Sequence, residues 1–312
     1  YTKFVRGRLR YFLSQSSFAD FMYEYAYFKR PVKEQVLSIS SEEKRSIQQA
    51  LFENISGENR YYRYDFLFDN CTTRLRDLIF RATGKDEFLP PSIAEKGTTF
   101  RDYLHVYLDQ AHMPWTKLGI DLLLGAGTDQ VMNVKQSMFL PDPLMEGVSL
   151  AKTNGSPLEQ ESSMLLDYPV VTAVQPHLID YSPLLVFLLI AIASLWGSFF
   201  KMGVAIKLTV WSDLLLFGLS GIMGVILMLA WFGTDHESFR FNLNLLWASP
   251  INLLFFYERI KSSHWYKKWL IINSLLVLLL CGGYLIWPGI INPSLFPFII
   301  AMSLRSWIGA RS

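Results

Sequence analysis

The chain has 312 residues, of which 51% are hydrophobic, and a formal net charge of +2. This charge is too small, and Lys and Arg are too interleaved with Asp and Glu, for nucleic-acid binding through counterion release, so that class of partner is excluded. The mean hydropathy of +0.23 exceeds that of ordinary soluble domains, and the excess lies in the second half of the chain. We therefore expect a polar domain, residues 1–180, followed by a membrane domain, residues 181–312.

A capping box opens the first clear helix of the polar domain. Ser40 supplies a hydroxyl at the helix start and Glu43 a carboxylate three residues later, before apolar residues at helical spacing. Ser56 and Gly57 end this helix. Residues 58–68 then mix aromatic and charged side chains over a strand-like run.

Cys71 directly follows that run, within the sequence YDFLFDNCTTRLRD at positions 64–77. Asp69 or Asn70 suits an N-cap, and an apolar stripe at helical spacing follows (Leu75, Leu78 and Ile79). This pattern predicts a helix with Cys71 in its first turn. Helix amides, with Arg74 and Arg76, would lower the pKa of the thiol and favour a nucleophile. The alternative is a small residue buried at a helix start.

The rest of the polar domain contains weaker signals. Residues 100–110 and 119–124 have helical patterns, and β-branched residues predict a strand over 168–174. Residues 153–163 are polar and contain Gly and Pro, which predicts an exposed loop.

Five apolar segments follow. Leu184–Phe200, Leu214–Phe232 and Trp269–Trp287 have spanning or near-spanning length. Leu243–Tyr257 and Ile290–Leu304 are shorter and contain prolines, which suits a kinked span or a re-entrant segment. We interpret all five as spans.

The loop charges orient these spans. The cations that five spans place on one side are Lys201, Lys207, Arg259, Lys261, Lys267, Lys268, Arg305 and Arg311. Arg240 is the only Lys or Arg residue that falls in the short loops on the opposite side. The positive-inside bias makes the first group cytoplasmic, so residues 1–180 lie in the periplasm if the membrane is a Gram-negative inner membrane. An unpaired cysteine is unusual in that oxidising compartment, which favours catalysis by Cys71.

A thiol nucleophile needs a general base. His236 follows Asp235 in the predicted periplasmic loop that contains Arg240, although it suits an interfacial cap equally well. The other histidines are poorer candidates: His105 in an apolar helix, His112 and His177 in loops, and His264 on the cytoplasmic side. No set of His, Cys, Asp and Glu has metal-ligand spacing, so we expect no metal and no cofactor.

Several motifs together resemble a known bacterial family. They are ENR at 58–60, Tyr64, DNCTTRLRD at 69–77, GIDLLLG at 119–125, FLPD at 139–142, TDH at 234–236 and NLNLLW at 242–247. The family was first defined as a domain of unknown function, and its membrane-bound members are similar to lipoprotein N-acyltransferases. The DNCTTRLRD block is its most specific part.

The resemblance implies an α+β fold: a papain-like, permuted NlpC/P60-like periplasmic domain, then an α-helical transmembrane domain of about five spans. It implies that Cys71 is the nucleophile and that the usual histidine precedes it, which in this chain means before Tyr1. We expect an upstream segment, so the base stays open between a histidine there and His236. Asn70 is the candidate oxyanion donor. The candidate substrate-binding residues are Tyr64, Arg74 and Arg240, although a surface ion pair is the commoner role for an arginine such as Arg74.

The expected reaction moves a fatty-acyl chain from a membrane phospholipid, through a thioester on Cys71, to the α-amine of a diacylated lipoprotein. Both partners carry acyl chains, and the lipid bilayer holds them, which accounts for the spans. One alternative is a membrane-tethered cysteine hydrolase that cuts cell-wall peptides or lipid esters with water as acceptor. Another is a non-catalytic membrane scaffold with an unreactive thiol. The acyl donor, its chain and the oligomeric state stay open.

Overall fold

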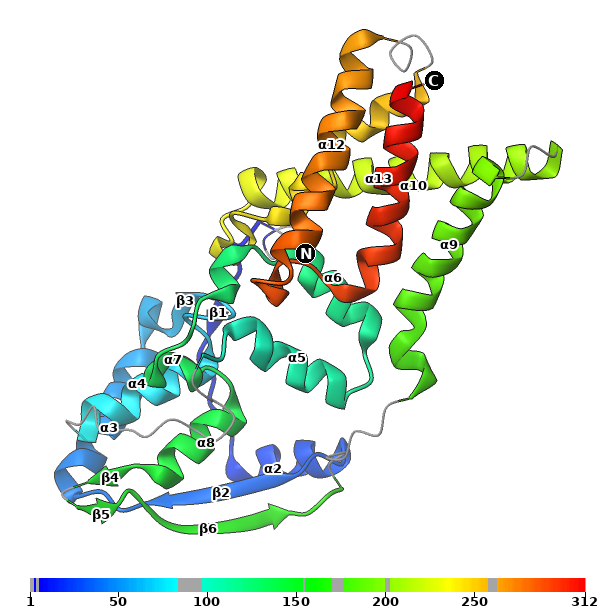
Figure 1. Ribbon diagram of the computed structural model, residues 1–312. Helices are drawn as coiled ribbons and strands as arrows, with labels where there is room; N and C mark the ends of the chain where they lie inside the picture. The colour runs from blue at the N-terminus through cyan, green and yellow to red at the C-terminus, as the bar shows by residue number, and fades with distance from the viewer. Residues whose placement is uncertain are drawn as a thin grey trace. The chain divides into compact units, whose positions relative to one another are not determined.

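A computed structural model describes residue 3 and residues 6–83, 97–153, 155–169, 177–199, 203–257 and 263–311 (Figure 1). The chain forms two compact units. Unit 1 comprises Tyr1–Tyr103 and Gln130–Thr172, and unit 2 comprises Leu104–Asp129 and Ala173–Ser312. This grouping differs from a division at residue 180 chiefly because Leu104–Asp129 belongs to unit 2.

Unit 1 is an α+β unit. In chain order it contains β1 (Arg10–Phe12), α2 (Phe18–Tyr27), β2 (Val32–Leu37), α3 (Ser41–Ile55), η1 (Gly57–Arg60), β3 (Tyr61–Arg63), α4 (Cys71–Thr83), the start of α5 (Phe100–Gln110), α7 (Val134–Ser137), α8 (Pro141–Leu150), β4 (Lys152–Thr153), β5 (Ser156–Pro157) and β6 (Glu159–Leu166). Within the described residues the strands form three two-stranded antiparallel sheets, β1 with β3, β2 with β6 and β4 with β5. The expected papain-like fold is therefore not confirmed.

The longest strand pair joins segments far apart in the sequence. Figure 1 shows β2 and β6 side by side, and their register runs from Val32 opposite Leu166 to Leu37 opposite Glu159. The prediction of a loop over 153–163 was wrong, because these polar residues form β5 and most of β6 by pairing with distant or neighbouring strands. The strand predicted over 168–174 is absent at residues 168–169, and residues 170–174 lie outside the described part.

The helices predicted around the cysteine are confirmed. Ser40 caps α3, accepting a hydrogen bond from the Glu43 backbone N–H at 3.2 Å while its own N–H donates to the Glu43 carboxylate at 2.6 Å. α4 begins at Cys71, and α5 has the predicted bounds. A small apolar core that includes Ile79, Phe80 and Met138 fixes the inner face of α4.

Unit 2 is helical within the described residues. It contains the rest of α5, α6 (Pro114–Leu123), η2 (Ala126–Asp129), η3 (Leu178–Tyr181), α9 (Ser182–Phe199), α10 (Gly203–Gly233), η4 (Glu237–Phe239), η5 (Leu243–Leu246), η6 (Pro250–Phe256), α12 (His264–Gly283), η7 (Pro288–Ile290), η8 (Pro293–Leu295) and α13 (Phe296–Arg311). Three described segments are long and apolar enough to cross a membrane: Leu178–Trp196, Lys207–Gly233 and His264–Gly283. They overlap the three segments of spanning length in the sequence.

The two shorter segments differ from the prediction of five spans. Leu243–Tyr257 contains two 3₁₀ helices, and the longer one, η6, rises only about 14 Å at about 2 Å per residue. It packs against α10, where Gly221 permits the approach: a Cβ there would lie 2.6 Å from Leu253 Cγ. α13 begins at Phe296 and is about 24 Å long, less than the bilayer core of about 30 Å. Five spans are therefore not confirmed.

The cations used to orient the spans are only partly described. Lys201, Arg259 and Lys261 lie outside the described residues. Arg305, expected in a loop, lies within α13 and forms a two-pronged ion pair with Asp213 of α10, with distances of 2.7 and 2.6 Å. This pair joins two helices of unit 2.

Candidate active site

Cys71 is the first residue of α4, and its side chain is exposed. The preceding Asn70 is buried, and its Oδ1 accepts a hydrogen bond from the Thr73 N–H at 2.9 Å. Asn70 Nδ2 donates to the carbonyl oxygens of Phe66 at 2.7 Å and Phe139 at 3.0 Å. Asn70 thus fixes the start of α4, and both of its amide hydrogens are directed at backbone oxygens.

Backbone donors lie beside the thiol. Within the described part of the chain, the N–H groups of Cys71 and Thr72 have no hydrogen-bond partner. The first N–H groups of a helix have no intrahelical acceptor, and the helix dipole places partial positive charge there. This end of α4 therefore suits a developing negative charge.

Two tyrosines and an ion pair lie near Cys71. Arg74 forms a two-pronged ion pair with Asp69, at 2.7 and 2.9 Å, and its guanidinium lies 3.8 Å from the centre of the Tyr62 ring. Burial, then the negative charge of the Cys71 thiolate, raises the pKa of Tyr64 to about 12. The same two causes raise the pKa of Tyr62. Both tyrosines are therefore neutral phenols at neutral pH, and the Arg74 charge is balanced by Asp69.

Arg76 does not belong to this surface. It is buried, and its guanidinium bonds to the Asp77 carboxylate at 2.9 Å and to the Lys135 carbonyl oxygen at 2.7 Å. Sequence position alone had grouped it with Arg74 beside the thiol.

The thiol opens onto a cavity of about 730 Å³ within unit 1, which we call the Cys71 groove. Its wall from α4 includes Cys71, Arg74, Leu75, Leu78, Arg81 and Ala82. Its other walls include Tyr11, Phe12 and Leu13, then Ala50 and Leu51 of α3, and Arg60 and Tyr62. Polar residues also line it, namely Ser46, Asn54, Asn59, Asp69, Thr73 and Asp77. The groove thus combines a nucleophile, a partly apolar lining and arginines.

Unit 1 contains no histidine in its sequence, since all five fall in unit 2. His236 precedes η4, and its ring lies 4.7 Å from that of Phe239. Arg240 is exposed in the same loop. Cys71 and these two residues belong to different units, so the roles expected of His236 and Arg240 stay predictions.

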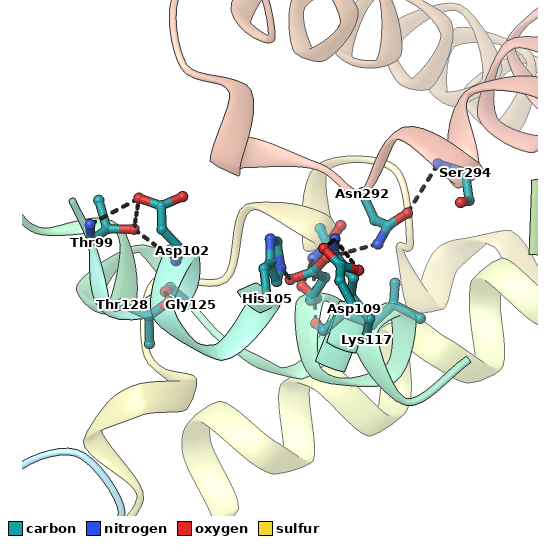
Figure 2. Close-up of polar contacts among 12 residues, drawn as sticks. Thr99, Asp102, His105, Asp109, Lys117, Gly125, Thr128, Asn292 and Ser294 are labelled. Atoms are coloured by element: carbon teal, nitrogen blue, oxygen red, sulfur yellow. Dashed lines mark hydrogen bonds and ion pairs between the residues drawn. The ribbon is translucent and has the colours of Figure 1, made fainter. Parts of the chain in front are cut away.

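A histidine and a carboxylate form a polar cluster inside unit 2 (Figure 2). His105 Nε2 lies 2.7 Å from Asp121 Oδ1, and Asn292 Nδ2 donates to Asp121 Oδ2 at 2.7 Å. The side chain of His105 is 24% exposed and that of Asp121 is 5% exposed. Sequence analysis did not single out Asp121, although a carboxylate within the apolar run at 119–125 was a usable signal.

A second histidine pair also lies in unit 2. His112 Nδ1 is 3.1 Å from both carboxylate oxygens of Asp180, and its ring centre is 4.5 Å from that of His177. Among the residues the structure describes, no group of three or more His, Cys, Asp or Glu side chains suits a metal ion.

Comparison with known families matches both parts of the chain. Residues 1–101, which include Cys71, match the Lnb N-terminal periplasmic domain. Residues 175–311 match the Lnb transmembrane domain. The chain is thus similar to both Lnb domains. Together with its apolar helices, these matches indicate a membrane protein with a periplasmic part. No curated protein and no solved structure gave a match.

Proposed function

We propose that this protein is a lipoprotein N-acyltransferase of the bacterial inner membrane with Cys71 as nucleophile. The observation that carries the proposal is the position of Cys71, exposed at the start of α4 and lining a partly apolar groove. The matches to the two Lnb domains support a membrane enzyme of lipoprotein processing. The acyl donor is a membrane phospholipid and the acceptor a diacylated lipoprotein.

In the first step, the Cys71 thiolate attacks the carbonyl carbon of a fatty-acyl ester. The carbonyl oxygen becomes an oxyanion, and the unpartnered N–H groups of Cys71 and Thr72 stabilise it. We assign this role to the backbone because the Asn70 amide bonds to carbonyl oxygens. The ester C–O bond then breaks, the lysolipid alkoxide leaves and takes a proton, and the acyl chain stays on sulfur as a thioester.

In the second step, the α-amine of the lipoprotein's diacylglyceryl-cysteine attacks the thioester carbon. A C–N bond forms, the C–S bond breaks, and the thiolate is regenerated as the amine loses a proton to a base. The step from thioester to amide is downhill, so the transfer is effectively irreversible. A soluble enzyme would have to expose both acyl chains at about 0.8 kcal/mol per methylene, which favours reaction at the bilayer surface.

The base is a histidine in this proposal, and His236 is the candidate within this chain. Substitution of His236 by Gln, with kcat measured against pH, tests that role: loss of the true base removes the acidic limb of the profile.

The test is mass spectrometry of lipoprotein N-termini from cells whose N-acylation depends on this protein. We expect Cys71→Ala to abolish the N-acyl group and Cys71→Ser to reduce it strongly, because a hydroxyl is a weaker nucleophile. Cys281→Ala is the matched control, since Cys281 is the other cysteine of the chain and lies in α12. Unchanged N-acylation in Cys71→Ala contradicts the proposal.

The second candidate is a membrane-tethered cysteine hydrolase, which the same exposed thiol supports. It differs only in the acceptor, which is water. Purified protein in phospholipid vesicles would then release free fatty acid at the same rate with and without a lipoprotein bearing a free α-amine. An acyltransferase instead forms the amide when that amine is supplied.

A further inference from the structure

One face of α4 continues from the nucleophile along the Cys71 groove. Cys71, Leu75, Leu78 and Ala82 all line the cavity, and their spacing places them in one row along the helix. The opposite face, with Phe80, is buried in the core of unit 1, as is Ile79 beside the row. The row therefore forms an apolar track that begins at the sulfur atom.

The walls facing this track combine exposed apolar side chains with the polar residues Ser46, Asn54, Asn59 and Arg60. Leu51 and Leu75 are 39% and 52% exposed, and the aromatic wall residues Tyr11, Phe12 and Phe68 are 44–54% exposed. No described residue of α3 is buried, although the helix has an apolar stripe. Apolar surface of this extent, gathered in one groove, is typical of a binding site.

The length of the track suits an acyl chain. At about 1.5 Å per residue, the row from Cys71 to Ala82 spans about 16 Å. A zigzag of carbon–carbon bonds about 1.5 Å long advances about 1.25 Å per bond, so the track matches about 13 bonds of an extended chain.

One donor atom of an arginine that lines the same cavity has no hydrogen-bond acceptor. Among the described residues, Arg60 Nε is buried and has no hydrogen-bond acceptor, although its guanidinium lies against the Phe12 and Tyr61 rings. A buried donor without an acceptor is unfavourable. A phosphate oxygen in the groove would supply that acceptor, and together with the apolar track on α4 this favours a phospholipid as occupant.

We propose that the Cys71 groove binds the donor phospholipid, with the transferred acyl chain along Leu75, Leu78 and Ala82 and the phosphate at Arg60. The inference rests on the proposed function and adds to it: the distal residues Leu78 and Ala82 set the length of chain that is accepted. Arg81, which also lines the cavity, places a charge near the distal end where the apolar track stops.

The test shortens the track in the full-length protein. Purified variants are incubated with vesicles that contain equimolar phosphatidylethanolamines with short, medium and long saturated chains, and the chain on Cys71 is identified by mass spectrometry of the trapped thioester. We expect Ala82→Trp to lower the ratio of long to short chains about tenfold, since excluding two methylenes changes binding by roughly that factor. Leu78→Trp, nearer the sulfur, lowers the ratio further.

The control is Phe52→Trp, which lies on α3, a helix that also contributes to the groove, but outside the groove lining. It should leave the ratio unchanged. An unchanged ratio of long to short chains in Ala82→Trp overturns the inference. If Leu78→Trp does not fold, the result for Ala82→Trp is sufficient. Arg60→Gln should lower the yield of thioester without changing the ratio, and an unchanged yield removes Arg60 from the site.

Failure of the inference differs from failure of the proposed function. If wild-type Cys71 acquires no chain from any vesicle, the proposed function fails. If wild-type Cys71 is acylated but the Trp variants keep the wild-type ratio, only the chain-binding track fails. Crosslinking of a peptide segment into the groove during turnover would also overturn the track.

Discussion

At the scale of single residues, the thiol is coupled to the phenols beside it. The negative charge of the Cys71 thiolate is the second cause, after burial, of the raised pKa values of Tyr62 and Tyr64. A nearby negative charge disfavours the tyrosinate form, so removal of the thiolate must favour tyrosinate. We therefore expect Cys71→Ala to lower the pKa of Tyr64 from about 12 and that of Tyr62 in the same direction.

NMR titration with ring-labelled tyrosine measures this change. Cys281→Ala is the control, because that thiol lies in α12 and does not contribute to either shift. Tyr62 and Tyr64 titrating unchanged in Cys71→Ala would mean that the sulfur does not lie beside the two phenols.

Asn70 presents a second residue-scale prediction, because it holds the thiol in place. Asn70→Ala removes the N-cap acceptor and leaves the Phe66 and Phe139 carbonyl oxygens without these donors. We expect the free energy of unfolding of unit 1 to fall by about 2 to 4 kcal/mol. Thermal unfolding of the purified protein checks the effect. Asn70→Ser keeps a cap acceptor and should lose less stability, whereas equal losses in Ser and Ala would contradict a capping role.

At the scale of elements, two carboxylates join α5 to α6 in different environments. Asp121 of α6 binds His105 of α5 and is buried, whereas Asp109 of α5 binds Lys117 of α6 at 2.8 Å and is 55% exposed (Figure 2). Loss of Asp121 leaves buried donors unpaired, while loss of Asp109 breaks a solvated pair. We expect Asp121→Ala to lower the free energy of unfolding by about 3 kcal/mol.

Asp109→Ala, the matched control, should cost less than about 1 kcal/mol. The two variants can be compared in one thermal denaturation series in detergent. Similar effects from the two substitutions would show that the Asp121 cluster does not hold the two helices together.

An element can be predicted from sequence when its interaction partners lie nearby in the chain. Ser40 and Asn70 act on residues three positions away, so α3 and the start of α4 were predictable. β6 pairs with β2, more than a hundred residues earlier, and its polar sequence has no strand signal of its own. The carboxylate of Asp121 within an apolar run was a signal, but its partners His105 and Asn292 could not be predicted because they are distant in sequence.

At the scale of the whole molecule, hydrophobicity predicted three long apolar helices but not the path between them. Leu243–Tyr257 is apolar enough to resemble a span, yet Pro250 and the buried Asn252 suit the short helices that pack on α10. Asn252 donates a hydrogen bond to Ser220 of α10 at 3.0 Å. Hydropathy along the sequence does not predict which residues make such a contact.

The orientation of the membrane protein gives a whole-molecule prediction. The basic residues at the helix ends predict that unit 1, with Cys71, faces the periplasm. A membrane-impermeant thiol reagent should therefore label Cys71 in intact spheroplasts, and Cys71→Ala should remove that label. Labelling that requires membrane lysis would place the cysteine on the cytoplasmic side and reverse the orientation.

The central claim is that Cys71 carries a fatty-acyl chain and delivers it to an amine. Its most direct measurement is a chase: full-length protein is acylated from isotope-labelled phospholipid vesicles, the Cys71 thioester is identified by mass spectrometry, and a diacylated lipoprotein with a free α-amine is then added. We expect the label to leave Cys71 and appear in the amide of the lipoprotein. A Cys71 that never acquires the label, or that loses it only to water, would contradict the account.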